Sequence, residues 1–217
     1  GTYVQLDADQ LPGVCRDWVT VDQAVSIYDE TYGLTLACPD APMVQIGDFH
    51  FGKEQKQVPR DENPVLLAWP MNNYWDTNFC AKQPGRHSFT YVVAPFTKFD
   101  AASANETAVK ASQPVQLYPA IHCPNKEEGI LLDVQGAVPY YVKASEDGKA
   151  IIVRLHNLDQ EDQSVELALP DREVNRAYYV DPMETIGGEI QVRDGKVSAR
   201  IPAQGWRSVR LETIQPL

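Results

Sequence analysis

The 217-residue chain lacks long apolar runs, and its 19 lysines and arginines are outnumbered by 30 aspartates and glutamates. A membrane-spanning helix needs about 20 apolar residues in succession, so we expect none. The net charge of −11 disfavours binding to nucleic acid or to anionic membranes, because both repel an acidic protein. The sequence also shows no signal peptide and starts at Gly1 without a methionine, so we expect a segment of a longer protein.

Metal-binding patterns are also missing. The four cysteines are widely spaced and form no CxxC pair, and the four histidines form no HxH or HExxH pattern. Asp48 and His50 would share a strand face and could hold a metal, but we favour a simple pair at a strand end. We predict four buried thiols, with one or two disulfides as the alternative, at Cys15, Cys38, Cys80 and Cys123.

Catalytic patterns are equally scarce. No GxSxG turn, phosphate-binding glycine loop or dinucleotide motif occurs. A glycosidase needs two carboxylates across a cleft, but most acidic residues here are typical of turns. We expect solvated turn positions for Asp147, Asp159, Asp162 and Asp194. The chain is therefore predicted to hold no catalytic and no metal residue, although a triad dispersed along the sequence stays open as an alternative.

What the sequence does contain is period-two alternation of apolar residues. Val165, Leu167 and Leu169 would share one strand face, and so would the apolar residues of 149–158. Asp147-Gly148 and Asp194-Gly195 lie between such strands and favour type I′ hairpin turns. Residues 128–217 are therefore predicted to form an immunoglobulin-like β-sandwich of seven or eight strands.

The first half of the chain is β-rich but less regular. Alanines favour one helix within 99–112, and the three prolines of 114–128 indicate a linker, placed at 121–127. Short strands, separated by prolines and polar loops, are expected at 18–21, 24–29, 34–37, 43–46, 65–69 and 87–94. The predicted class is thus all-β.

The most unusual stretch is residues 69–79, which contain two tryptophans, a tyrosine, a phenylalanine and three asparagines. Amides can donate to and accept from sugar hydroxyls, and aromatic rings offer flat apolar faces to a pyranose. The alternative is a loop held together by its own aromatic rings, with the asparagines bound to local backbone.

MNNYWDTNF at 71–79 resembles the "MNN-x-W-x-TNF" signature of bacterial-type α-mannosidases of glycoside hydrolase family 38. Further similar pieces follow the family's order, namely YGLTLA at 32–37, DAPMV at 40–44, QPG at 83–85, FTY at 89–91 and IVRLHN at 152–157. The resemblance covers nearly the whole chain.

The resemblance implies a place within a larger enzyme. Residues 1–120 would belong to a mutarotase-like β-supersandwich, and 128–217 would be the terminal sandwich. The zinc ligands and catalytic aspartates of the family lie in an N-terminal domain, so no cofactor is expected in this chain. The candidates for the rim of the sugar site are Asn72, Asn73, Trp75, Thr77 and Asn78.

The predicted function is that of a non-catalytic C-terminal segment of a retaining α-mannosidase, soluble in the bacterial cytoplasm or periplasm. Its expected partners are the catalytic domain of the same polypeptide and a mannose-containing carbohydrate. An exposed apolar face on the first half would also favour a homodimer. The alternative is a stand-alone carbohydrate-binding module.

Overall fold

The computed structural model describes residues 3–47, 60, 64–71, 82–117, 119, 130–136 and 138–214. The chain divides into two compact units, one formed by Val4–Gln116 and the other by Gly1–Tyr3 with Leu117–Leu217. Within the described part, no helix is both long and apolar enough to span a membrane. The assignment of residues 1–120 to a supersandwich and of 121–127 to a linker stays a prediction.

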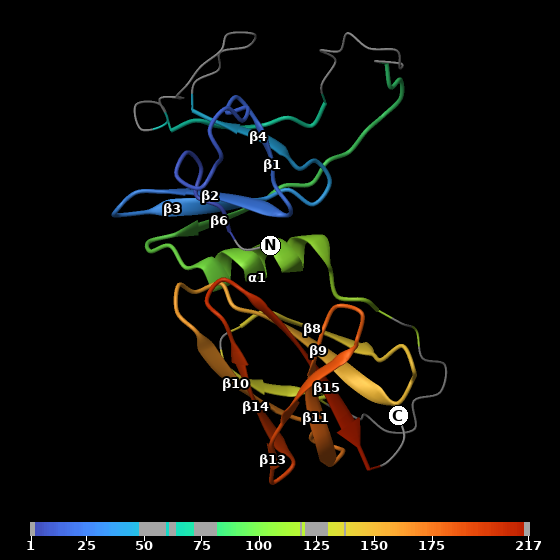
Figure 1. Ribbon diagram of the computed structural model, residues 1–217. Helices are drawn as coiled ribbons and strands as arrows, with labels where there is room; N and C mark the ends of the chain where they lie inside the picture. Colours follow the sequence, from blue (N-terminus) through green and yellow to red (C-terminus); the bar gives the residue numbers. More distant parts are fainter. Residues whose placement is uncertain are drawn as a thin grey trace. The chain divides into compact units, whose positions relative to one another are not determined.

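The first unit contains two three-stranded antiparallel sheets, ordered β1-β4-β5 and β2-β3-β6 (Figure 1). Its strands are β1 (Val19–Thr20), β2 (Ala24–Tyr28), β3 (Gly33–Ala37), β4 (Met43–Ile46), β5 (Leu66–Ala68) and β6 (Val92–Phe96). Each lies where alternation predicted a strand, except that the last one was expected from residue 87. It starts later, and the backbone N–H of Thr90 donates to Asp40 Oδ2 at 2.7 Å instead of to a neighbouring strand.

The core of the first unit is small. Among the described residues, Leu36, Cys38 and Val44 form its buried apolar cluster, with partly buried neighbours around them. The predicted helix is present as α1 (Ala101–Ser112) and packs against β2, β3 and β6. Asp100 caps its first turn by accepting from the Ser103 N–H at 2.7 Å, which satisfies one of the free donors there.

The second unit is a sandwich of two antiparallel sheets, ordered β13-β14-β10-β7 and β12-β11-β15-β9-β8 (Figure 1). The strand at 189–193 was expected to be continuous. Instead, the chain changes sheets at Gln191, between β12 and β13. The strands are β7 (Asp133–Gln135), β8 (Tyr140–Ala144), β9 (Ala150–His156), β10 (Gln163–Ala168), β11 (Val174–Val180), β12 (Ile186–Ile190), β13 (Val192–Arg193), β14 (Lys196–Ile201) and β15 (Trp206–Thr213). The all-β sandwich is confirmed.

The sandwich core follows from the alternation of its strands. In β14, every second residue is buried, and these residues face the same interior as Val165 and Leu167 of β10. The five-stranded sheet contributes Val153 and Leu155 of β9 with Leu211 of β15. Sixteen buried apolar residues form this one cluster, which supplies most of the burial that stabilises the unit.

Both predicted Asp-Gly hairpins form, but with different turns. Asp194 and Gly195 have φ of 51° and 73°, as a type I′ turn requires. Between β8 and β9 only Gly148 has a positive φ, 69°, so the predicted type I′ turn is wrong there. The turn is wider because Ser145 Oγ accepts from the Ala150 N–H at 2.9 Å and closes a longer loop.

Candidate functional site on the outer sheet face

The predicted sugar rim lies outside the described residues, namely Asn72, Asn73, Trp75, Thr77 and Asn78. The start of this stretch is described. The ring of Trp69 packs on that of Trp18, with centroids 5.6 Å apart, and its backbone N–H donates to Met43 O at 2.9 Å. This first tryptophan therefore belongs to the packing of the first unit.

No candidate metal centre is found where the structure describes the chain, since no three His, Cys, Asp or Glu side chains lie together there. Asp48 and His50 lie outside the described residues, as do Cys80 and Cys123. Cys38 is a buried thiol as predicted, and burial raises its pKa. Cys15 is exposed, so the prediction of four buried thiols is wrong at that position, which lies in the open segment before β1.

Several carboxylates of the sandwich accept hydrogen bonds or form ion pairs within the unit. Asp194 is an exposed turn residue, as predicted. Asp162, by contrast, accepts from the Ala203 N–H at 2.9 Å and pairs with Arg200 at 2.7 Å. The backbone hydrogen bond from Ala203, followed by the bond from Arg200, lowers the pKa of Asp162. It holds a loop in place and is more than a solvated turn residue.

The strongest ion pair joins a turn to a central strand. Arg210 of β15 is 6% exposed. Its Nη2 lies 2.8 Å from Asp147 Oδ2, and its Nε lies 2.9 Å from Glu212 Oε1. The hydrogen bond from Arg210, with a further one from Ser145, holds the pKa of Asp147 well below its usual range. Asp147 is an exposed turn residue, as predicted, and it also forms an ion pair with the buried Arg210.

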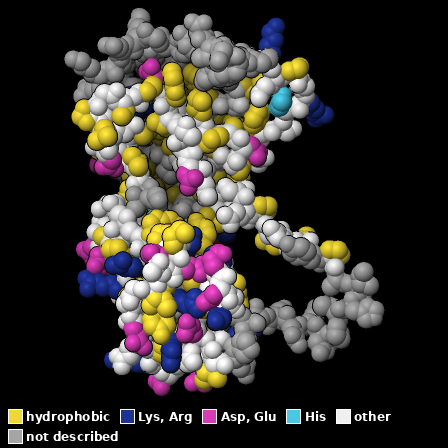
Figure 2. Space-filling model, turned by 45° about the vertical axis from the view of Figure 1, so that its right-hand side comes forward, with side chains coloured by type: hydrophobic (Ala, Val, Ile, Leu, Met, Phe, Trp, Pro, Cys, Tyr) yellow, Lys and Arg dark blue, Asp and Glu magenta, His cyan; other side chains and the backbone are white. Residues whose placement is uncertain are grey.

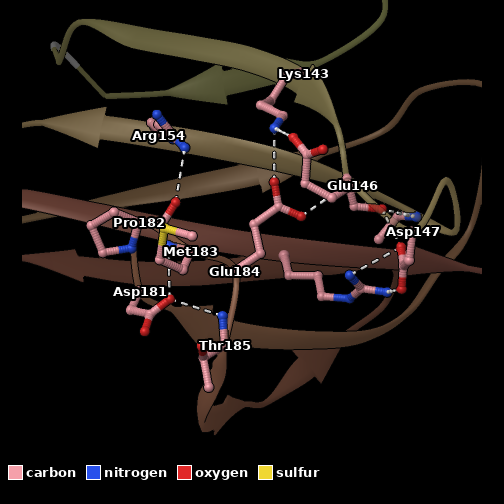
Figure 3. Close-up of polar contacts among 12 residues, drawn as sticks. Lys143, Glu146, Asp147, Arg154, Asp181, Pro182, Met183, Glu184 and Thr185 are labelled. Carbon is pink, nitrogen blue, oxygen red and sulfur yellow. Dashed lines mark hydrogen bonds and ion pairs between the residues drawn. The ribbon is translucent and has the colours of Figure 1, made fainter.

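A second polar cluster joins β8 to the loop 181–185. Glu184 Oε1 lies 2.9 Å from Lys143 Nζ, and Glu184 Oε2 accepts from the Glu146 N–H at 2.8 Å (Figure 3). Lys143 also pairs with Glu146. The bonds with Glu146 and Glu184 raise the pKa of Lys143, and the bond from Lys143 lowers that of Glu184. Figure 2 shows the same intermixing of acidic, basic and apolar side chains on the second unit.

Next to this cluster, the outer face of the sheet forms a shallow hollow of about 330 Å³. Tyr141 lies opposite Arg154 in the β8–β9 register, and Trp206 lies opposite His156 in the β9–β15 register. The hollow is lined by Tyr141, Val142, Lys143, Arg154 and Trp206. Sequence reasoning missed this set. The available signal was a tryptophan at an outward position of β15, where alternation predicts a polar residue.

The comparison with protein families gives one match within the second unit. Residues 140–212 match the glycosyl hydrolases family 38 C-terminal beta sandwich domain. The match begins at the first residue of β8 and ends at residue 212, so it includes the five-stranded sheet except for the last residue of β15. The comparison with curated proteins returned no match.

The family 38 sandwich is a non-catalytic domain, and it implies a catalytic domain in the same polypeptide. The match confirms the resemblance over 140–212, which include the IVRLHN piece at 152–157, whereas MNNYWDTNF and the pieces near it lie outside the matched residues. Asp147, Asp162 and Glu184 have lowered pKa values, because each accepts hydrogen bonds within the sandwich.

Proposed function

We propose that the chain is the C-terminal β-sandwich region of a retaining α-mannosidase, in which it supports the catalytic domain and shapes the rim of its sugar site. The observation that carries the proposal is the family match at 140–212, downstream of the MNNYWDTNF stretch at 71–79. The described residues offer no group that fits the zinc of such an enzyme. That metal would belong to the catalytic domain.

The rim role rests on the chemistry of residues 72–78. Amide side chains donate and accept at once, which suits adjacent sugar hydroxyls. An indole offers a flat apolar face to the carbon side of a pyranose. Asn73 and Trp75 combine both properties within three positions. Contacts of this kind would hold the substrate in register with a catalytic centre supplied by the other domain.

The test uses the full parent enzyme with Asn73→Ala and Trp75→Ala. We expect kcat/KM for a mannoside to fall at least tenfold while the melting temperature stays within about 2 °C, because a rim side chain binds substrate and carries little packing. Activity on nitrophenyl mannoside and calorimetric melting are the two measurements.

The matched control is Trp69→Ala. Its ring packs on Trp18, so this variant should lose stability while its folded fraction keeps normal specific activity. If Trp75→Ala behaves like Trp69→Ala, the rim role is wrong and the stretch is structural. Hydrolysis of the mannoside by the 217-residue chain alone would contradict a non-catalytic role.

A stand-alone carbohydrate-binding module is the second candidate function. The observation that favours it is the hollow on the outer sheet face, where two partly exposed aromatic rings lie beside a guanidinium. Sugar binding by the isolated chain would support this candidate, whereas a catalytic domain in the same polypeptide would contradict it.

A further inference from the structure

The hollow on the outer face is lined by two partly exposed aromatic rings. Tyr141 is 37% exposed and Trp206 is 41% exposed. Their rings are stacked, with centroids 5.9 Å apart and an interplanar angle of 28°. Large aromatic rings left on a sheet face that polar side chains could cover point to a ligand.

Trp206 is also held in a fixed orientation. Its ring stacks on that of His156, with centroids 4.0 Å apart and an interplanar angle of 4°. His156 is 4% exposed and lies directly opposite Trp206 in the β9–β15 register. One face of the indole is therefore occupied from below, and the ring is pre-organised before any ligand arrives, which lowers the entropic cost of binding.

The polar group in the hollow is Arg154. Its Nη2 donates to Pro182 O at 3.3 Å (Figure 3), and its Nε is buried with no hydrogen-bond partner. In the described part of the chain, no carboxylate forms an ion pair with it. The buried Nε is closed to a ligand, so the donors that a ligand oxygen in the hollow could use are the other N–H groups of this guanidinium.

The charges around the hollow select a neutral ligand. Lys143 is paired with both Glu146 and Glu184, so its ammonium is already neutralised. Of the two cations that line the hollow, Arg154 is the one without a carboxylate partner among the described residues. The chain as a whole has a net charge of −11. A multiply charged phosphate ligand is disfavoured by these surroundings. A neutral ring with one apolar face and several hydroxyls matches both the aromatic walls and the single donor.

We propose that this hollow is a binding subsite for one hexopyranose residue. The apolar face of the sugar would stack on Trp206 and Tyr141, and a sugar hydroxyl would accept from Arg154. A hollow of about 330 Å³ is at the small end of ligand sites, which fits one ring. The choice of mannose as the sugar rests on the proposed function, whereas the subsite itself rests on the outer-face geometry.

The test is a titration of the 217-residue chain, followed by NMR at the indole N–H of Trp206. Methyl α-mannoside and methyl α-glucoside are the probes. We expect saturable shifts with a Kd on the order of 1 mM for a ligand of this size. Sugar binding to the variants Trp206→Ala and Tyr141→Ala is followed by NMR at the backbone N–H groups of β8 and β9. Each variant should raise the Kd at least tenfold.

Tyr140→Ala is the matched control, because Tyr140 adjoins Tyr141 on β8 and is 46% exposed but does not line the hollow. It should leave the Kd unchanged, and so should Asn73→Ala in the rim stretch. Equal losses in Tyr140→Ala and Tyr141→Ala would overturn the subsite. So would binding unaffected by both hollow variants, or no binding of either sugar.

The two proposals fail separately. Binding of the glucoside but not the mannoside would keep the subsite and count against an α-mannosidase parent. Absence of binding to either probe would overturn the subsite and would leave the outer face to be covered by protein. The rim role is measured on the parent enzyme with other residues, so neither outcome decides it.

Discussion

At the residue scale, His156 is the most unusual side chain of the second unit. It is 4% exposed, and its Nε2 has no hydrogen-bond partner. Burial lowers its pKa from the ordinary value of 6.5 because a charged imidazole is poorly solvated beneath the indole of Trp206. The side chain is therefore held neutral as a flat support, and it is not available as a proton donor near pH 7.

This lowered pKa predicts how stability depends on pH. Below pH 6.5, the unfolded chain protonates at this position before the folded one, so the unfolded state binds more protons. The stability is complete above pH 6.5 and falls as the pH drops toward the folded-state pKa. We expect His156→Phe, which keeps a flat ring, to flatten the loss of free energy of unfolding between pH 7.5 and 5.5. Urea unfolding at a series of pH values measures this.

The control for this prediction is the exposed residue His87. His87→Phe should leave the pH dependence of the second unit as it is in the original chain. A pH profile that is the same in His156→Phe and in the original chain would refute the burial effect.

At the element scale, the hairpin of β8 and β9 is fastened to its sheet by an ion pair between distant residues. Arg210 of β15 reaches Asp147 in the hairpin turn. A second pair of the same chemistry, Arg200 with Asp162, lies on the exposed side of the sandwich, where the arginine side chain is 74% exposed. The two pairs differ mainly in the burial of the cation, since the arginine side chain of the first is only 8% exposed.

Burial predicts unequal effects when each cation is removed. Arg210→Met should lower the free energy of unfolding by about 1–2 kcal/mol, because Glu212 and Asp147 lose a desolvated partner. Arg200→Met should cost less than about 0.5 kcal/mol, since water replaces an exposed partner. Urea unfolding of both variants at pH 7 measures the difference. Equal losses would show that burial of the cation does not matter here.

At the scale of the whole molecule, the two units differ in how well they can support themselves. Among the described residues, the second unit has one buried cluster of sixteen apolar residues, whereas the buried cluster of the first unit has three. Exposed valines on its strand β6, Val92 at 37% and Val93 at 59%, add apolar surface that a complete domain would cover. The first unit is thus the one expected to need the rest of the polypeptide.

The difference predicts how fragments behave. A fragment of residues 117–217 should unfold in one cooperative transition, because it retains a contiguous core. A fragment of residues 4–116 should show a broad transition or none, since so small a buried cluster cannot offset the loss of chain entropy. Thermal unfolding followed by circular dichroism compares them. We expect a cooperative transition in fragment 117–217 and none in fragment 4–116. A cooperative transition in fragment 4–116 but not in fragment 117–217 would contradict the prediction.

The sequence alone determined most of the strands, the one described helix and the family. Alternation is a local property of a strand. The buried face of Val165, Leu167 and the apolar residues of β9 could therefore be predicted without knowing which strands lie beside them. Asp194-Gly195 similarly encodes its own turn, because only few residues accept two positive φ values in succession. The family was visible in short contiguous motifs, and the match over 140–212 confirms it.

Only the tertiary structure decided which outward-facing residues meet. Tyr141, Arg154 and Trp206 come from three strands, and Asp147 pairs with Arg210 sixty-three positions away. Alternation shows which face a side chain occupies, but strand order and register are set by packing between distant segments. The physical reason is that a strand forms its backbone hydrogen bonds with the partner strand that allows the apolar faces of both strands to be buried best. The hollow on the outer sheet face therefore exists only in the folded sheet.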